Sequence, residues 1–503
     1  MKQTTIAYIG GGSKNWAPGY FKDFLLQDAM SGVLRLYDIN LEAAKTNKLY
    51  FDKLVREHPS EVKSHWDCVV SPTLEEALES ADIVMISILP GQFKHMKEDV
   101  HHPQKFGIYQ SVGDTTGPGG YSRALRAIPI FLNFARKIKT HCPNAWVVNY
   151  TNPMSMLVNA LHMEYPEMKV FGYCHEVFDS QRLYASIYEL YSKLSDEGQK
   201  AFMKANYPVV KQELKSMGLK FKDYKKMTSI ARHDISVEVL GINHFTFVDK
   251  IEYQGQDVMP MVDAFIKLFR KAKAGSLGWM AFNPVKFFEN RHHIKFTFHE
   301  KNNLLGAAGD RHLAEFVPKL FLPLHQKRIS QYGFNLTPVW ARTVYDAYRR
   351  SRIKKELKPN IIIPLENSDE DGVTQLIPLV GGKPIITNLN VINQGQMPDL
   401  PLGTAVETNV RLSKDGIEPQ TTKPIQSSSI KKRLLIHATN QKEFVEHYRA
   451  HDFDGLLQVF LRDPSVSRLS KEDGTRLFLE MIEHNTEALE EWVILEKEKH
   501  NPS

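Results

Sequence analysis

Residues 145–154 read A-W-V-V-N-Y-T-N-P-M, and residues 169–176 read K-V-F-G-Y-C-H-E. Each stretch holds a short apolar run that is typical of a buried strand and that ends in polar side chains. Pro153 suits the first position of a helix and disfavours the α region for Asn152, so a strand should pass through a loop into a helix here. The two stretches therefore predict strands that end at one edge of an open α/β sheet.

The polar residues at these strand ends suggest a ligand site. Open α/β sheets bind ligands beyond the carboxyl ends of their strands, where Asn152, Cys174 and His175 would lie together. A thiolate, an imidazole and an amide oxygen beside a nucleotide site favour a divalent metal held against a substrate. Taken singly, Cys174 is better explained as a buried thiol and Asn152 as a loop cap, so the rest of the chain has to decide.

The N-terminal forty residues carry the pattern of a dinucleotide-binding unit. An apolar strand at residues 5–9 runs into a glycine turn at residues 10–13, and a second strand at residues 33–37 ends in Asp38. Glycines let backbone N–H groups approach a pyrophosphate, and the acid binds the ribose hydroxyls. The strict G-x-G-x-x-G spacing fails, because Asn15 stands at the third glycine position. Asp38 favours NAD over NADP, since its carboxylate repels a 2′-phosphate.

Further strands and loops continue a doubly wound sheet. A third strand at residues 83–88 ends near Pro90, and a glycine-rich loop at residues 113–120 precedes an amphipathic helix at residues 121–140. A loop of this composition at this place is expected to be functional and to lie over the nucleotide. The candidate cofactor-binding residues are Gly10, Gly11, Gly12, Ser13, Asp38, Pro90, Asp114 and Asn149.

Two later motifs add polar residues with chemical potential. A strand at residues 235–240 ends in G-I-N-H-F, which places His244 just past an apolar run. A lone histidine there is usually a satisfied core residue, but together with Cys174 it suits a transition-metal dication. In G-D-R-H, Arg311 could clamp a carboxylate and Asp310 could serve as a base, whereas a helix-capping Asp with an ion-paired Arg is an equal alternative.

The organisation that follows is an α/β chain with an N-terminal Rossmann-like doubly wound sheet and an intertwined C-terminal α+β domain. We expect an NAD-binding domain at residues 1–185, a helical Lys-rich insertion at 186–232, and a C-terminal domain at 233–490 for substrate, metal and oligomerisation. Neither repeats nor low-complexity linkers separate these parts, so they should share a core or intertwine.

Composition excludes several classes of protein. The chain has 503 residues, 42% of them hydrophobic, which fits a globular protein with more than one domain. Apolar stretches stay well short of the ~20 residues that cross a bilayer, and the N-terminus enters a strand without a signal sequence. The net charge of +6 comes without a basic stripe, so we expect neither nucleic-acid nor membrane partners. Three cysteines favour a reducing, cytoplasmic location.

From residue 6 to roughly residue 464, the chain resembles glycoside hydrolase family 4, the NAD- and divalent-metal-dependent glycosidases. The motifs that carry the resemblance are I-G-G-G-S, D-T-T-G-P-G-G, N-Y-T-N-P-M, C-H-E-V, G-I-N-H-F and N-Q-G-Q-M-P-D-L-P. I-L-P-G-x-F, I-Y-Q-S-V-G-D-T-x-G-P-G-G and A-A-G-D-R-H-L-A-E-F are most similar to the α-galacturonidase branch. The resemblance implies C3 oxidation by NAD⁺, C2 deprotonation, elimination at C1, water addition and re-reduction, outside the usual two-carboxylate scheme.

The resemblance also implies roles for single residues. Cys174 and His244 would hold the metal, with Mn²⁺ favoured among the divalent ions, and Asn152 would bind substrate hydroxyls. His175 would be the acid that assists the leaving group. Asp310 would be the C2 base, although parts of the family use a tyrosine, and Asp114 stands where much of the family has Glu. Family members suggest a homodimer or a homotetramer.

The substrate class rests on an absence. Phospho-glycosidase branches carry an Arg that aligns with Met96, and its loss removes a charge-assisted contact to a 6-phosphate. A uronate carboxylate still needs a cation, which Arg311, His312 or Lys14 could supply. Galacturonide is favoured over glucuronide by branch resemblance only. The alternatives are an α-glucuronidase, α-glucosidase or 6-phospho-glycosidase of the family, an NAD-dependent hydroxy-acid dehydrogenase, and a non-catalytic NAD sensor.

Overall fold

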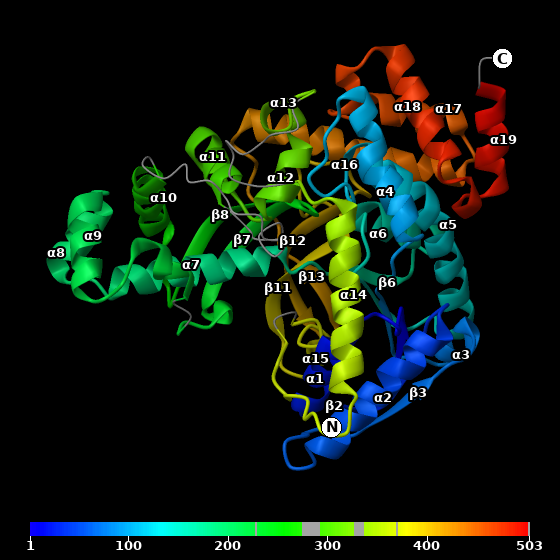
Figure 1. The fold of residues 1–503 in the computed structure, drawn as a ribbon, viewed down its shortest axis with the longest axis horizontal. Helices are drawn as coiled ribbons and strands as arrows, with labels where there is room; N and C mark the ends of the chain where they lie inside the picture. Colours follow the sequence, from blue (N-terminus) through cyan, green and yellow to red (C-terminus); the bar gives the residue numbers. More distant parts are fainter. Residues whose placement is uncertain (227–228, 274–291, 326–335, 369–370, 501–503) are drawn as a thin grey trace.

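The architecture comes from a computed structural model that describes residues 1–226, 229–273, 292–325, 336–368 and 371–500 (Figure 1). A nine-stranded sheet with the order β13-β12-β11-β6-β5-β4-β1-β2-β3 runs through its centre. Its six N-terminal strands are all parallel to one another. They are β1 (Lys2–Ile9), β2 (Met30–Tyr37), β3 (Trp66–Val70), β4 (Ile83–Ile86), β5 (Trp146–Asn149) and β6 (Lys169–Gly172).

The order 3-2-1-4-5-6 of these parallel strands is that of a Rossmann fold, which confirms the fold class expected from the sequence. Both faces of the sheet are covered, because alternate residues of β1 enter different cores. Ile6 and Tyr8 pack under α1 and α2, while Ala7 and Ile9 pack under α3, α5 and α6. These helices are α1 (Ala17–Leu26), α2 (Leu41–Glu57), α3 (Leu74–Leu78), α4 (Phe93–His101), α5 (Gly117–His141) and α6 (Met154–Glu164).

The other three strands of the large sheet come from the C-terminal half of the chain. They are β11 (Ile385–Ile392), β12 (Ala405–Ser413) and β13 (Gly416–Pro419), and each is antiparallel to its neighbour. Asn390 of β11 pairs with Gly172 of β6, so the C-terminal half completes the N-terminal sheet. The two halves are therefore intertwined, as the lack of linkers suggested, while the exact division at residues 185 and 232 stays a prediction.

A second, four-stranded sheet forms the arm on the left of Figure 1. Asn409 of β12 ties it to the large sheet, accepting from the N–H of Val239 at 2.7 Å and donating to the carbonyl of Val237 at 2.8 Å. The arm has a hydrophobic core of its own. It contains β7 (Ile235–Ile242), β8 (Phe245–Tyr253), β9 (Gln256–Asp257), β10 (Leu305–Gly306), α7 (Glu176–Ser192), α8 (Asp196–Met203), α9 (Tyr207–Ser216), α10 (Met259–Lys273) and α11 (His293–Asn302).

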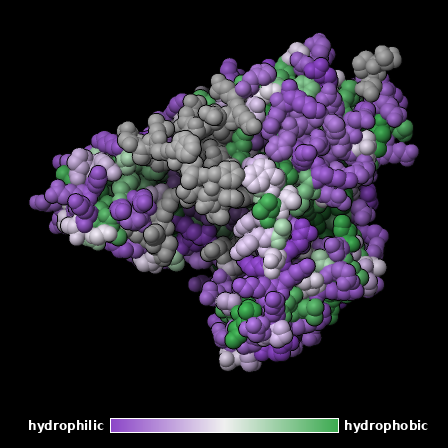
Figure 2. Space-filling view, viewed as in Figure 1, coloured by the Kyte–Doolittle hydropathy of each residue, from purple (hydrophilic) through white to green (hydrophobic). Residues whose placement is uncertain are grey.

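The remaining helices close the molecule around the large sheet (Figure 1). Phe444, Phe460 and Phe478 of the C-terminal helices share a core with Tyr121 of α5. Hydrophilic residues cover most of the face in Figure 2, and among the described helices none is long and apolar enough to span a membrane. These helices are α12 (Asp310–Phe316), α13 (Pro318–Phe321), α14 (Val339–Glu356), α15 (Leu376–Leu379), α16 (Ser428–Arg449), α17 (Phe453–Arg462), α18 (Lys471–Glu483) and α19 (Glu491–His500).

Candidate active site

One cavity of about 1450 Å³ extends from the glycine turn after β1 to the ends of β5, β6 and β7. It lies beyond the carboxyl ends of the parallel strands, where open α/β sheets bind their ligands. Most of the residues expected to be functional line it, but Gly11, Asn149 and Asp310 do not. Those that line it are Gly10, Gly12, Ser13, Asp38, Pro90, Asp114, Asn152, Cys174, His175, His244, Arg311 and His312.

The glycine turn forms one end of the cavity. Gly10 has φ of +92°, and a Cβ there would lie 2.0 Å from the carbonyl oxygen of Ser87. The N–H of Gly12 donates to Oδ2 of Asp38 at 2.9 Å, and the N–H of Asn40 donates to its Oδ1 at 2.8 Å. A Cβ on Gly12 would meet that carboxylate at 2.7 Å. The turn is therefore bare backbone held against an acid, the arrangement that a pyrophosphate and a ribose require.

Two of the expected cofactor residues do not line the cavity but contact the backbone beside it. Gly11 packs on β2, since a Cβ there would lie 2.8 Å from that of Leu36. Asn149 is fully buried at the end of β5, where its side chain donates to the carbonyl of Thr151 at 3.0 Å and accepts from its N–H at 2.8 Å. These contacts shape the loop that follows β5, so both residues act on the cavity through the backbone.

Deeper in the cavity, Asp114, His244 and His312 place one ligand atom each within 4.8 Å of one another. The hydroxyl of Thr115 donates to Oδ1 of Asp114 at 2.7 Å, so its oxygen accepts from Nδ1 of His244 at 2.8 Å. That bond leaves a lone pair on Nε2 of His244. Nδ1 of His312 is buried with no hydrogen-bond partner among the described residues.

The protonation states of this cluster match those of metal ligands. Burial, with His312 beside it, lowers the pKa of His244 to about 3, and burial also lowers the pKa of His312. Burial alone would raise the pKa of Asp114, but His312, Arg123 and His244 outweigh it and hold that pKa below its usual value. Two neutral imidazoles beside an ionised carboxylate can bind a divalent cation without first losing a proton.

Cys174 lines the same cavity as this cluster, although it is almost wholly buried. Met154, Val158 and Ala405 surround it on the apolar side. Burial, followed by the charge of Glu407, raises the pKa of the thiol well above its usual value. A cation would have to displace that proton to gain a thiolate ligand. Its role as a metal ligand stays a prediction.

His175 and Glu176 begin α7 at the mouth of this cluster. The imidazole of His175 lies with its centre 5.7 Å from the ring of Trp16, and both residues line the cavity. Glu176 accepts from the N–H of Gly309 at 2.6 Å and lies 3.7 Å from Nε2 of His312. Glu176 belongs to the C-H-E-V motif, but nothing in the motif indicated that its carboxylate would lie beside His312.

Asp310 does not line the cavity, because its carboxylate contacts the backbone of α11 instead. It is buried, and its Oδ1 accepts from the N–H of Lys295 at 3.0 Å in the first turn of α11. Burial raises the pKa of this carboxyl to about 6. Asp310 caps the first turn of α11 rather than its own helix, whose N-cap is Gly309, so the alternative of a residue that caps its own helix is not what the structure shows. Its role as a base stays a prediction.

Among the described residues, five arginines line the cavity, and Arg123, Arg311 and Arg342 are the ones whose charges act on the Asp114 cluster. Arg311 donates to Oγ1 of Thr337 at 2.7 Å, and Arg342 donates to the carbonyl of Val112 at 2.7 Å. Arg123 lies 3.9 Å from Asp114. Arg342 comes from α14 and was missed in the sequence, because no motif marks this helix. Its Nη1 lies 3.5 Å from the sulfur of Met96.

Comparison with known proteins identifies the family. The model of family 4 glycosyl hydrolases matches residues 5–190, and the model of their C-terminal domain matches residues 239–466. The chain belongs to glycoside hydrolase family 4. It is therefore a glycosidase, which confirms the resemblance and the enzyme class inferred from the motifs.

Full-length relatives place this family 4 glycosidase near one branch. It is 39% identical to an α-galacturonidase of Thermoanaerobacter italicus over 97% of each chain. It is 35% identical to an α-galacturonidase of Bacillus subtilis, covering 96% of this chain and 98% of that one. The crystal structure of lplD from Bacillus subtilis superposes with a TM-score of 0.79 at 34% identity, covering 96% of this chain and 100% of that chain.

A solved 6-phospho-α-glucosidase from gut microorganisms, in complex with NAD and Mn²⁺, shares the fold of this glycosidase. Its TM-score is 0.72 at 18% identity, over 97% of this chain and 99% of that chain.

Proposed function

We propose that this glycosidase is an NAD- and Mn²⁺-dependent α-galacturonidase that hydrolyses small α-linked galacturonides. The observation that carries the proposal is a single cavity that joins the glycine turn to the Asp114, His244 and His312 cluster and has guanidinium groups in its wall. The full-length relatives at 35–39% identity are α-galacturonidases, and a structure with the same fold contains NAD and Mn²⁺.

The residues of the cavity fit both cofactors. When bound, NAD⁺ would take the hydride from C3 of the sugar, and the metal would polarise the C2 and C3 oxygens as a Lewis acid. The small residues of the glycine turn would let the pyrophosphate approach the start of α1, and Asp38 would bind the ribose hydroxyls. His244, Cys174, Asp114 and His312 offer the metal an imidazole, a thiolate, a carboxylate and a second imidazole.

One substrate contact follows from a group that lacks a protein partner, and two further roles follow from the position of the residues. Oδ1 of Asn152 is buried and has no hydrogen-bond partner among the described residues, so it can accept from a sugar hydroxyl. His175, at the mouth of the cavity, gives a proton to the departing oxygen at C1. Removal of the C2 proton falls to Asp310, which first has to leave Lys295, or to a tyrosine.

The cation for the uronate carboxylate has two well-placed sources. Lys14, considered from the sequence, lies 3.6 Å from Asp346 and is partly neutralised. Arg311 and Arg342 line the cavity beside the metal cluster, and Arg342 reaches the side chain of Met96. The phospho-glycosidase branches place a guanidinium at position 96. In this chain the guanidinium of Arg342 on α14 would take its place and bind a planar carboxylate.

A panel of nitrophenyl glycosides tests the activity. It contains α-galacturonide, α-glucuronide, α-galactoside and 6-phosphoglucosides, assayed with NAD⁺, Mn²⁺ and a reductant, each omitted in turn. We expect turnover of α-galacturonide that is lost without NAD⁺ or Mn²⁺ and that produces no net NADH. Full activity without either cofactor contradicts the mechanism. Faster turnover of the α-glucuronide would mean that the enzyme is an α-glucuronidase, and stoichiometric production of NADH would indicate a dehydrogenase.

We also infer a cytoplasmic homo-oligomer, a homodimer or a homotetramer. The three cysteines are all free thiols, which suits a reducing compartment. Light scattering at micromolar concentration measures the mass, and a monomer at all concentrations contradicts this part of the proposal.

A further inference from the structure

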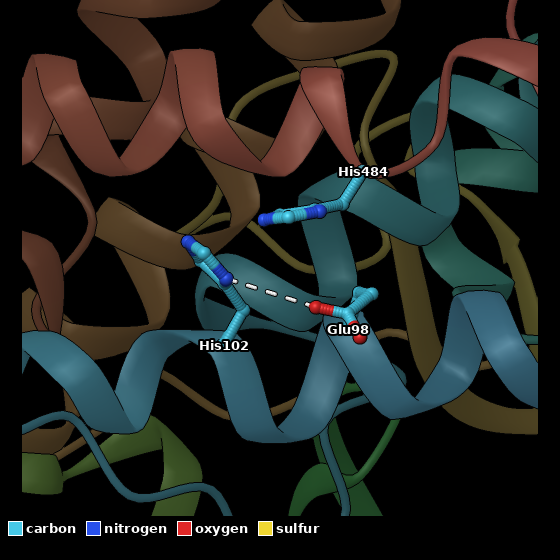
Figure 3. Close-up of side chains that lie close together, drawn as sticks. All are labelled: Glu98, His102 and His484. Atoms are coloured by element: carbon cyan, nitrogen blue, oxygen red, sulfur yellow. Dashed lines mark ion pairs between the residues drawn. The ribbon is translucent and has the colours of Figure 1, made fainter.

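A second group of potential ligands lies where α4 meets α18, outside the active-site cavity. Glu98, His102 and His484 place one ligand atom each within 4.8 Å of one another, and none of the three lines the cavity. Figure 3 shows Glu98 and His102 on one helix, with His484 reaching toward them from the helix opposite. Glu98 and His102 are four residues apart, which puts both side chains on one helical face.

His102 is the residue that points to a ligand. Its side chain is almost wholly buried, with the residue 3% exposed, and its Nε2 lies 2.7 Å from Oε2 of Glu480. A carboxylate only accepts, so this bond puts a proton on Nε2. Nδ1 is buried without a hydrogen-bond partner among the described residues, and it faces Oε2 of Glu98 at 3.7 Å. Its ring centre lies 4.6 Å from that of His484.

We propose that Glu98, His102 and His484 form a second metal site, separate from catalysis, that binds a zinc-class dication and joins α4 to α18. Two imidazoles and a carboxylate favour Zn²⁺ or Co²⁺ over Mn²⁺ or Mg²⁺, and the exposed side of His484 leaves room for a water as fourth ligand. Glu480 supplies the carboxylate that commonly orients a metal-bound histidine from behind.

The geometry and the charge of the site are compatible with this ion. Zinc bonds of about 2.0–2.1 Å put tetrahedral ligand atoms roughly 3.4 Å apart, so the side chains close by about 1 Å on binding. His484 ends α18 on the surface and can make most of that movement. Lys105 and Arg476 add positive charge nearby, but the carboxylates of Glu98 and Glu480 balance it.

The site would fix a wall of the active-site cavity. Residues 93–96 of α4 line that cavity, while α18 belongs to the C-terminal helices. α4 already meets the segment that follows α18 through His95, 2.8 Å from Glu487, and α5 meets it through Arg126, which donates to Asn485 at 2.8 Å. A cation at the end of this row of polar contacts would stabilise the junction without touching the substrate.

Metal counting tests the site in the full-length protein. Metal is removed with a chelator, Zn²⁺ is titrated by calorimetry, and Co²⁺ is followed by its visible absorption. We expect His484→Ala and Glu98→Gln each to bind one Zn²⁺ fewer per chain than the wild type, and Glu480→Gln to bind that ion about 10- to 100-fold more weakly. His65→Ala, which removes another exposed histidine, should keep the wild-type count.

Stability and activity give the second readout. Zn²⁺ should raise the melting temperature of the wild type, and this rise should be smaller in His484→Ala, while the NAD⁺- and Mn²⁺-dependent turnover of His484→Ala stays at the wild-type level. An unchanged zinc count in both His484→Ala and Glu98→Gln overturns the proposal. An equal loss in His65→Ala also overturns it, because surface histidines would then account for the binding. Neither outcome depends on the substrate proposed above.

Discussion

Arg342 is half-buried in the cavity wall, and the buried Nε of its guanidinium has no hydrogen-bond partner among the described residues. Burial lowers its pKa to about 10, so it stays protonated at neutral pH. Because a buried cation is costly without an anion to bind, an unsatisfied guanidinium in a ligand cavity indicates an anionic ligand. Asp114 is the carboxylate that acts most strongly on the pKa of Arg342, and the proposed metal would occupy it.

Replacement of Arg342 by Gln should reduce discrimination for the uronate. A charged hydrogen bond contributes about 1.5–3 kcal/mol, so kcat/KM for nitrophenyl α-galacturonide should fall about 10- to 100-fold more than for the α-galactoside. Arg352→Gln, on the exposed side of the same helix, serves as the matched control. An equal loss on both substrates would mean that Arg342 only supports the site, and Arg311→Gln then becomes the variant to measure.

We predict that Asp38 determines the choice of nicotinamide cofactor. Asp38→Ala removes the acceptor of the Gly12 N–H and the repulsion against a 2′-phosphate. We expect NAD⁺ to bind at least about 10-fold more weakly, as for a lost charged hydrogen bond, and the ratio of NADP⁺ to NAD⁺ affinity to rise. Fluorescence titration with both cofactors measures the ratio. The assignment fails if the ratio is the same in Asp38→Ala and in Glu42→Ala, an exposed acid on the next helix.

His437 should make stability depend on pH. Its Nε2 donates to the carbonyl of Phe316 at 3.0 Å, and burial lowers the pKa of the ring, with Asp463 opposing and Arg433 adding to the shift. A folded pKa below the unfolded value gives stability that is complete above about pH 6.5 and is lost as the pH falls, by at most about 1.4 kcal/mol per pH unit.

The variant His437→Gln keeps a donor but removes the titration. Urea denaturation at pH 7.5 and 5.5 should therefore show a smaller wild-type advantage in the free energy of unfolding at the lower pH. Comparing the two proteins cancels the contributions of the other buried histidines and acids. A wild-type advantage that is the same at both pH values would show that His437 does not titrate in this range.

At the scale of elements, the contact of α4 with α5 depends on one buried ion pair. Asp99 and Arg126 are both almost fully buried, and Nη1 of Arg126 donates to Oδ1 of Asp99 at 2.9 Å. Arg126→Met leaves the carboxylate uncompensated and should cost about 3–5 kcal/mol, whereas adding Asp99→Leu should recover much of that loss. Urea denaturation of the four proteins of this cycle measures the coupling. Additive losses contradict it, and the exposed Arg136→Met is the control.

Elements that are defined by local signals could be predicted from the sequence. The parallel strands are short apolar runs ending in glycine or polar residues, so β1, β4, β5 and β6 could be placed, and their order follows from the doubly wound pattern. Because parallel strand ends share one edge, Asn152 and Cys174 could also be expected to line one cavity. His244 follows β7 of the second, antiparallel sheet, so strand order alone could not bring it there.

Side chains from helices could not be placed in the same way. Whether Asp310 faces the cavity or Lys295, and whether Arg342 faces the cavity or solvent, depends on how α11, α12 and α14 pack. Sequence spacing gives the face of a helix but not the neighbour that covers it. The assignment of a base and of a carboxylate-binding cation therefore needed the folded molecule.

The long-range pairing of β11 with β6 is the feature that makes the molecule one unit. Residues 385–392 could be recognised as strand-like, but nothing local marks Gly172 as the partner of Asn390. Leu389 and Val391 then pack in the same hydrophobic core as Tyr8 and Phe171. The N-terminal Rossmann unit therefore obtains part of its sheet and part of its core from residues more than two hundred positions later in the chain.

This sharing predicts that the NAD-binding half does not fold alone. A fragment of residues 1–190 exposes the unpaired edge of β6 and loses the apolar cover from Leu389 and Val391, so it should aggregate or fail to bind NAD⁺. Coexpression with residues 233–503 should restore a soluble complex that binds NAD⁺. In the full chain, urea should produce one transition, with near-ultraviolet circular dichroism and NAD⁺ binding lost together. A soluble fragment that binds NAD⁺ as tightly as the full chain would show that the shared sheet contributes little to the N-terminal half, because the remaining strands and helices would then suffice to hold the glycine turn against Asp38.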